Sequence, residues 1–274
     1  MKLIKLVSII AFALASGFAF AAAPGNIAVG SVEGTVVVTA ADGVEKQLVA
    51  GYVIRENSRV STDKDSTAKF ILANGTVVVL KPNTTLDISQ FEQNNPSAVD
   101  GQDYSTFATE PEATAGSLTT VRLVKGTALF KVAKLLPGSK LTVKTHGGDI
   151  SVKGTTFYVT VNGASVSAGC IDGAIAVSPT GRATLTLTSG KSATISGASG
   201  ALSFGRASVA LTNEAKTAFA AEETGKPSSS TSTGTGSSDA FDVTMPPASV
   251  EGTTGSDRIP EVNSASSVDD GRKY

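Results

Sequence analysis

The chain of 274 residues has little of the chemistry on which most enzyme and metal sites depend. It contains one cysteine, Cys170, one histidine, His146, and no tryptophan. A single cysteine excludes an internal disulfide, and one cysteine with one histidine cannot build a zinc site of the usual kind. We therefore expect Cys170 to be a small buried apolar residue rather than a reactive thiol paired with His146.

Catalytic motifs are also scarce. His146-Gly147-Gly148 is similar to part of a hydrolase oxyanion hole, but the chain has no G-x-S-x-G nucleophile elbow. Ser61-Thr62-Asp63-Lys64 matches the S-x-x-K of acylating serine enzymes, without the S-D-N and K-T-G elements that this chemistry requires. We therefore predict no enzyme activity, catalytic residue, cofactor or metal. The alternative is a secreted hydrolase with a carboxylate pair such as Asp63 with Asp87.

Long apolar runs and basic stripes are missing after the first 21 residues. The absence of a basic stripe with interleaved aromatics argues against nucleic acid as a partner. No later run approaches the roughly 20 apolar residues that a membrane span needs. Residues 1–21 have the features of a cleavable export signal: Lys2 and Lys5, then an apolar stretch, then Ala19-Phe20-Ala21. We predict a periplasmic or extracellular protein without a stable membrane anchor.

The sequence does contain many short apolar runs that are separated by turn dipeptides. Asn74-Gly75 joins two such runs, and a two-residue turn there would pair Leu72 with Val77. Both faces of that hairpin would be apolar, which indicates a central position. This pattern predicts an all-β fold, an irregular β-sandwich or coiled β-sheet, over residues 22–206.

The stretch from Val143 to Val161 contains a change of phase. Ile150 and Val152 share one face of a strand, whereas Phe157 and Val159 after the change occupy odd positions. Because a strand repeats every two residues, this change predicts an extra residue, most simply a bulge or kink at Gly154.

The same stretch resembles the FecR-type domain of bacterial envelope proteins. That family has a glycine-led strand, a V-x-T segment, a V-[RK]-G-T-x-F-x-V segment and a D/E-G-x-x-x-V strand. Here these correspond to residues 126–132, 143–145, 152–159 and 172–177, and the likeness covers roughly residues 28 to 196. The residues that carry this structural motif are Gly126, Val152, Gly154, Thr155, Phe157, Val159 and Gly173.

The resemblance implies a place in envelope signalling. Full-length regulators of the family act on a sigma factor from a cytoplasmic segment and receive a signal from an outer-membrane TonB-dependent transporter. Residues 1–21, read as a cleavable signal, lead us to expect the β-domain alone. We therefore predict a non-enzymatic binding or scaffold module that recognises an envelope protein or a glycan through a sheet edge or loop. The alternative is a periplasmic signalling component, and the oligomeric state stays open.

Three further segments have distinct compositions. Residues 90–120 are polar and rich in Asn, Glu, Pro and Thr, which predicts an exposed loop. Residues 207–223 place apolar side chains at helical spacing, which predicts a short helix capped at Thr212 or Asn213. Residues 224–274 are dominated by Ser, Thr, Gly, Pro and acids, which predicts a disordered tail.

Overall fold

The computed structural model describes residues 22–94, 116–197 and 200–223. The predicted export signal and the predicted tail lie outside these residues, as does most of the predicted loop. The ends of that loop are strands instead, because Gln90 belongs to β9 and Thr120 to β10, and the neighbouring Phe91 and Thr119 are buried. Polar composition misled the loop prediction, since these residues alternate with buried ones.

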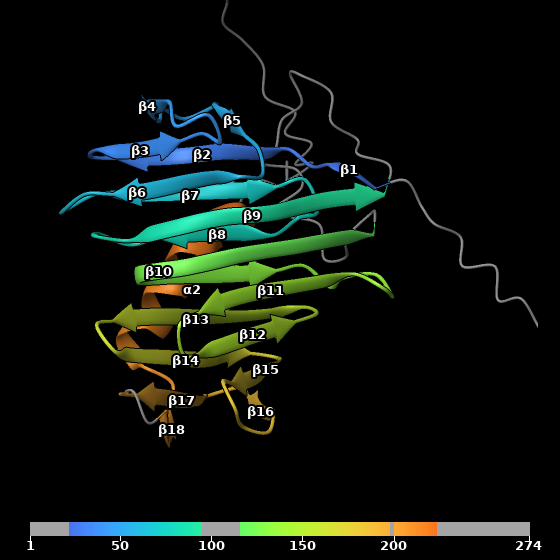
Figure 1. Cartoon of the computed structure of the whole chain (residues 1–274), viewed down its shortest axis with the longest axis vertical. Helices are drawn as coiled ribbons and strands as arrows, with labels where there is room; N and C mark the ends of the chain where they lie inside the picture. Colours follow the sequence, from blue (N-terminus) through green and yellow to red (C-terminus); the bar gives the residue numbers. More distant parts are fainter. Residues whose placement is uncertain (1–21, 95–115, 198–199, 224–274) are drawn as a thin grey trace, which may run out of the picture. The chain divides into compact units, whose positions relative to one another are not determined.

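Two sheets lie face to face, and their strands follow one another from β4 and β5 at one end to β16 and β18 at the other (Figure 1). Sheet A contains, in spatial order, β4 (Glu45–Gln47), β3 (Val36–Thr39), β6 (Ser58–Thr62), β9 (Thr85–Asn94), the first half of β10 (Ser117–Val132), β11 (Lys140–Thr145), β12 (Gly148–Val152), β15 (Ala174–Pro179) and β16 (Leu185–Thr188). The short β1 (Ala22–Pro24) pairs with the end of β9.

The described strand pairs of sheet B are all antiparallel, whereas sheet A has one parallel pair, β10 with β11. Sheet B contains β5 (Val53–Ile54), β2 (Ile27–Glu33), β7 (Thr67–Leu72), β8 (Val77–Leu80), the second half of β10, β13 (Thr155–Asn162), β14 (Ser165–Asp172), β17 (Lys191–Ser196) and β18 (Ala201–Arg206). The chain therefore coils between two layers, and the predicted all-β sandwich is confirmed.

The phase change at Gly154 marks a crossing from one sheet to the other. β12 belongs to sheet A and β13 to sheet B, with Gly154 between them at a φ of 144°. The inward direction reverses when an extended chain moves between facing layers, so inward residues change from even to odd without any insertion. The predicted kink is present, but the predicted extra residue is not needed. β10 also changes phase, from inward Leu123 to inward Phe130, and there a bulge between Leu123 and Lys125 interrupts its register with β9.

The hairpin between β7 and β8 has a different register from the one predicted. Ile71 pairs with Val77 and Phe70 with Val78, because the turn contains three residues, 73–75, rather than two. Gly75, at a φ of 81°, supplies the left-handed residue that closes such a turn. Phe70 and Val78 consequently face the interior between the sheets, and Ile71 and Val77 face outward.

Helix α2 (Val209–Glu223) lies against that outward face of sheet B (Figure 1). Its buried Ala215 and Phe219 contact an apolar cluster on the sheet that includes Val79, Leu129 and Tyr158. The cap is Ser208, whose Oγ accepts a hydrogen bond from the backbone N–H of Leu211 at 3.4 Å, and not the predicted Thr212 or Asn213. The predicted short helix is therefore present, and it covers one face of sheet B.

Candidate binding site

The seven motif residues lie at crossings and in the core, where they maintain the fold. Phe157 and Val159 are fully buried between the sheets, and the Phe157 ring stacks on Phe130 with centroids 4.7 Å apart. Val152 and Thr155 flank the crossing at Gly154 and are also buried. The motif thus fills the interior and leaves no exposed constellation for a ligand.

The motif glycines stand where another segment of the chain approaches closely. At Gly126, whose φ is 89°, a Cβ would come within 2.5 Å of the Cα of Thr84. The Thr84 hydroxyl uses this closeness to accept a hydrogen bond from Thr127 N–H at 3.0 Å. Likewise Thr155 Oγ1 donates to the carbonyl of Ala174 at 2.9 Å, beside Gly173. A side chain at Gly126 would force β10 away from the segment that contains Thr84.

The structure does not bring the proposed carboxylate pair together. Asp87 on β9 is paired with Arg59 on β6, with Arg59 Nε 2.6 Å from Asp87 Oδ1. This hydrogen bond, with the charge of Asp87, raises the pKa of Arg59. Asp63 lies four residues beyond Arg59 along the chain, which is about 13 Å in an extended strand. Because Asp87 is the register partner of Arg59, Asp63 and Asp87 are separated by a similar distance. This exceeds the carboxylate separation that glycoside hydrolysis requires.

Cys170 and His146 lie in different environments. Cys170 is fully buried in β14, and burial raises the pKa of its thiol to about 11. His146 is exposed in the turn between β11 and β12. A thiol with that pKa carries almost no thiolate at neutral pH, so the pair cannot form a nucleophile and base. Among the described residues, no three His, Cys, Asp or Glu side chains gather as metal ligands would.

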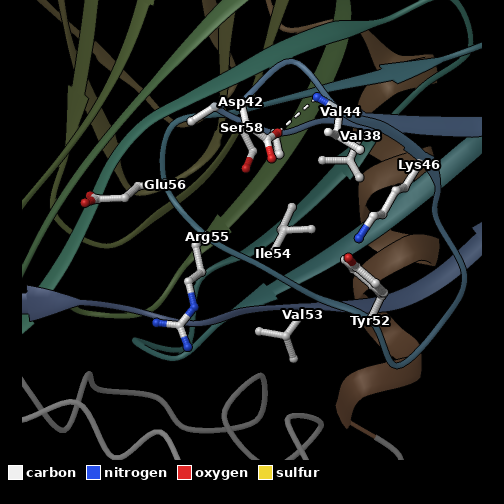
Figure 2. A pocket seen from close by; sticks show the side chains of 12 residues that line it. Val38, Asp42, Val44, Lys46, Tyr52, Val53, Ile54, Arg55, Glu56 and Ser58 are labelled. Carbon is white, nitrogen blue, oxygen red and sulfur yellow. Dashed lines mark hydrogen bonds between the residues drawn. The ribbon is translucent and has the colours of Figure 1, made fainter.

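A pocket of about 390 Å³ lies at the first edges of the two sheets, where β3 and β4 of sheet A face β5 of sheet B. The β3–β4 turn forms one side, held by the bond from Val44 N–H to Asp42 Oδ1 at 3.0 Å (Figure 2). On the other side, β5 is anchored to β2 by a bond from Val29 N–H to the carbonyl of Tyr52 at 2.8 Å. A side-chain hydrogen bond therefore holds one wall, and backbone pairing holds the other.

The pocket combines an apolar interior with a charged rim of both signs. Val38 and Ile54 are buried within it, whereas Val44 and Tyr52 keep 48% and 36% of their surface exposed. The rim carries Asp42, Lys46, Arg55 and Glu56. Figure 2 shows the Lys46 and Tyr52 side chains pointing toward one another across the pocket.

Glu56 also has a structural task, because its Oε2 accepts a hydrogen bond from Phe91 N–H at 3.0 Å. This bond ties the segment after β5 to β9 in sheet A. Sequence reasoning missed the pocket, since its residues come from four strands and the segments between them, with no motif. The one available signal was Tyr52, a rare aromatic residue that directly follows the turn glycine Gly51.

The architecture defines a class of protein: an all-β sandwich in which the chain passes between two facing sheets, with one helix on the outer face of sheet B. Comparison of sequences makes this assignment specific, because residues 58–176 match the family model described as FecR protein. Residues 58–176 therefore match a FecR-type domain, and all seven motif residues lie inside this range. Most of the pocket precedes that range, so the pocket is a feature of this chain beyond the match.

Two crystal structures from Parabacteroides distasonis ATCC 8503, at 1.65 and 2.50 Å resolution, are similar to this chain. Both are provisionally described as an anti-sigma factor, with 18% and 17% identity and TM-scores of 0.41 and 0.40. Each alignment covers 54% of this chain and 59% of the other. No curated protein matches the chain. No helix within the described residues is long and apolar enough to cross a membrane.

Proposed function

We propose that this protein is an exported, non-enzymatic binding module of the bacterial envelope, and that its pocket at the first sheet edges binds a partner protein. The observation that carries the proposal is the exposure of Val44 and Tyr52 above a buried apolar floor. Exposed aromatic and aliphatic side chains, surrounded by a polar rim, are typical of the centre of a protein interface.

The lining favours a protein segment over a glycan. Sugar rings are usually bound by aromatic faces together with several polar groups, and this pocket has one aromatic side chain, Tyr52. Its remaining apolar surface is aliphatic, from Val38, Val44 and Ile54. Rim charges of both signs, such as Lys46 and Glu56, would orient a partner that carries complementary charges.

Two further points support the rest of the proposal. The features of residues 1–21 support export, because a charged start, an apolar stretch and an A-x-A site are what signal peptidase substrates have. The scattered positions of Asp63, Asp87, His146 and Cys170 support a role without catalysis, since acid–base or nucleophilic chemistry requires such groups within hydrogen-bond reach.

The test is affinity capture from envelope extract with a Val44→Asp/Tyr52→Ser variant. Both side chains are partly exposed and their backbone bonds remain possible, so the fold should persist. We expect the affinity of the variant for the partner to fall at least about tenfold, because interface anchors of this kind each contribute more than ~1 kcal/mol. The matched control is Val124→Asp/Leu118→Ser, which changes two exposed apolar residues on β10.

Two outcomes would reject the proposal. One is capture of the same proteins by the pocket variant as by the natural chain. The other is displacement of the bound material by soluble peptidoglycan fragments, which would identify the ligand as a glycan.

A signalling role is the second candidate, and the FecR match favours it. In that role the captured partner would be part of a relay from an outer-membrane transporter to a sigma factor. The measurement is transcription of transporter genes in cells that carry the pocket variant. Altered transcription supports signalling, whereas unchanged transcription with loss of the partner supports a scaffold.

A further inference from the structure

The last strand of sheet B, β18, has the features of an unprotected edge. It is six residues long, and it pairs along its whole length with β17. Phe204 keeps 67% of its surface exposed, although its register partner Ala193 is buried in the core. The described residues place no strand on the other side of β18.

The outward backbone groups of β18 can be assigned from one bond. Ala207 N–H donates to the carbonyl of Gly190 at 2.9 Å, which makes these two a hydrogen-bonded pair in the antiparallel ladder. Bonded and non-bonded pairs alternate, so Phe204 and Leu202 belong to non-bonded pairs with β17. Their N–H and C=O groups therefore point away from β17, toward the open edge.

The other edge strands have protection that β18 lacks. β4 carries the charged Glu45 and Lys46, β5 has two residues, and β16 has four. Charge and short length are the common means by which proteins prevent edge pairing. β18 contains no proline, and its one charge, Arg206, stands at its last position.

We propose that β18 pairs with β18 of a second copy, antiparallel and centred on Ser203, to form a two-fold dimer. This association is separate from binding at the proposed pocket, which lies at the opposite end of the strand order. In this register Leu202 of each copy faces Phe204 of the other, and both form backbone hydrogen bonds through their outward groups. Ala201 faces Gly205, and Ser203 faces Ser203.

The choice of a second copy follows from this self-complementarity. No charge faces a like charge, because Arg206 lies opposite Gly200, and the two apolar pairs lie on either side of the axis. The formal net charge of −1 gives little repulsion between copies. One strand pair is small beside the 1,200–2,000 Å² that stable interfaces bury, so we expect a dimer that dissociates on dilution.

The first test is sedimentation equilibrium of the full chain over a concentration series, with Phe204→Lys as the variant. We expect the natural chain to associate and the variant to raise the dimer dissociation constant about tenfold or more, because each dimer contains two such anchors. The matched control is Val124→Lys, which changes another exposed apolar residue, 42% exposed, and should leave the constant unchanged. A natural chain that stays monomeric up to millimolar concentration overturns the proposal and leaves the edge to a different partner.

The second test fixes the register by disulfide cross-linking. Facing residues of a non-bonded antiparallel pair have Cα atoms about 4.5 Å apart, within the range for a disulfide. Ser203→Cys should therefore give a covalent dimer under mild oxidation. Ala201→Cys is the control, because its two copies would lie about 13 Å apart, and the native Cys170 is buried. Equal cross-linking of the two variants, or none at Ser203→Cys, contradicts the proposed pairing.

Discussion

Two apolar clusters hold this protein together, and they differ in how many elements share them. The main core fills the space between the sheets and takes buried side chains from nearly every strand, from Ile27 to Ile195. The second cluster lies outside sheet B and joins α2 to four strands through residues such as Leu129, Tyr158 and Phe219. The main core therefore determines whether the sandwich exists, whereas the second determines only whether the helix stays on it.

This difference predicts two kinds of response to mutation. Truncation of a side chain in the main core should lower the free energy of unfolding of the whole sandwich, because no strand can leave without exposing the others. A loss in the second cluster can be met by local opening of α2, at a cost below that of global unfolding. The predictions below test that division, from the largest effect to the smallest.

Phe157→Ala in the main core should have the largest effect. Phe157 is fully buried and stacks on Phe130, so truncation removes apolar burial and leaves a cavity between the sheets. We expect a loss of about 3–5 kcal/mol in the free energy of unfolding, measured by urea denaturation. Leu118→Ala is the control, because that side chain is 42% exposed on β10 and its truncation should change stability by less than about 0.5 kcal/mol.

Phe219→Ala in the second cluster should have a smaller and more local effect. The ring is buried against sheet B, and its loss should make opening of α2 easier by about 2 kcal/mol. Hydrogen exchange should rise for the α2 amides while β13 amides keep their protection. The control is Val209→Ala, at an exposed position of the same helix, which should leave hydrogen exchange of both α2 and β13 unchanged. Equal loss of protection in β13 would show that the two clusters unfold together.

Tyr158→Phe tests the polar contact at the start of the helix. The Tyr158 hydroxyl accepts a hydrogen bond from Ser208 N–H at 2.8 Å, just before α2 begins. The ring itself lies over Gly169, where a Cβ would come within 2.3 Å of it, and phenylalanine keeps that packing. We expect the free energy of opening of α2, measured by hydrogen exchange, to fall by about 1 kcal/mol. If the α2 amides of the variant are as well protected as those of the natural chain, apolar packing alone holds the helix on the sheet.

The sequence allowed the two-layer interior to be predicted better than the second cluster. Alternation of apolar residues at Ile150, Val152 and Phe157 predicted strands, and the phase change predicted a break at Gly154. The sequence of one strand cannot show that the chain passes between facing sheets at this break. Which side of a strand faces inward depends on where the other sheet lies.

Registers and the binding pocket depended on tertiary contacts. Asn74-Gly75 fits both a two-residue and a three-residue turn, and the choice is made by buried Asn74. Its Nδ2 donates to Ser117 Oγ at 3.0 Å, and its Oδ1 accepts from Thr76 N–H at 3.0 Å. The pocket likewise combines segments whose strands are too short to predict, such as β5 with two residues. Local propensity carries no information about partners so distant in the chain.

Arg59→Gln should have the smallest effect, because it belongs to neither cluster. Arg59 and Asp87 form their ion pair on the solvent side of sheet A, where the side chains are 56% and 21% exposed. Water and salt screen such a pair, so its removal should cost less than about 1 kcal/mol. Urea denaturation at low and at ~0.5 M salt should show the difference from the natural chain shrinking as salt rises. A loss as large as that of Phe219→Ala, unaffected by salt, would place the outer surface of sheet A among the determinants of stability and break the division between core and surface.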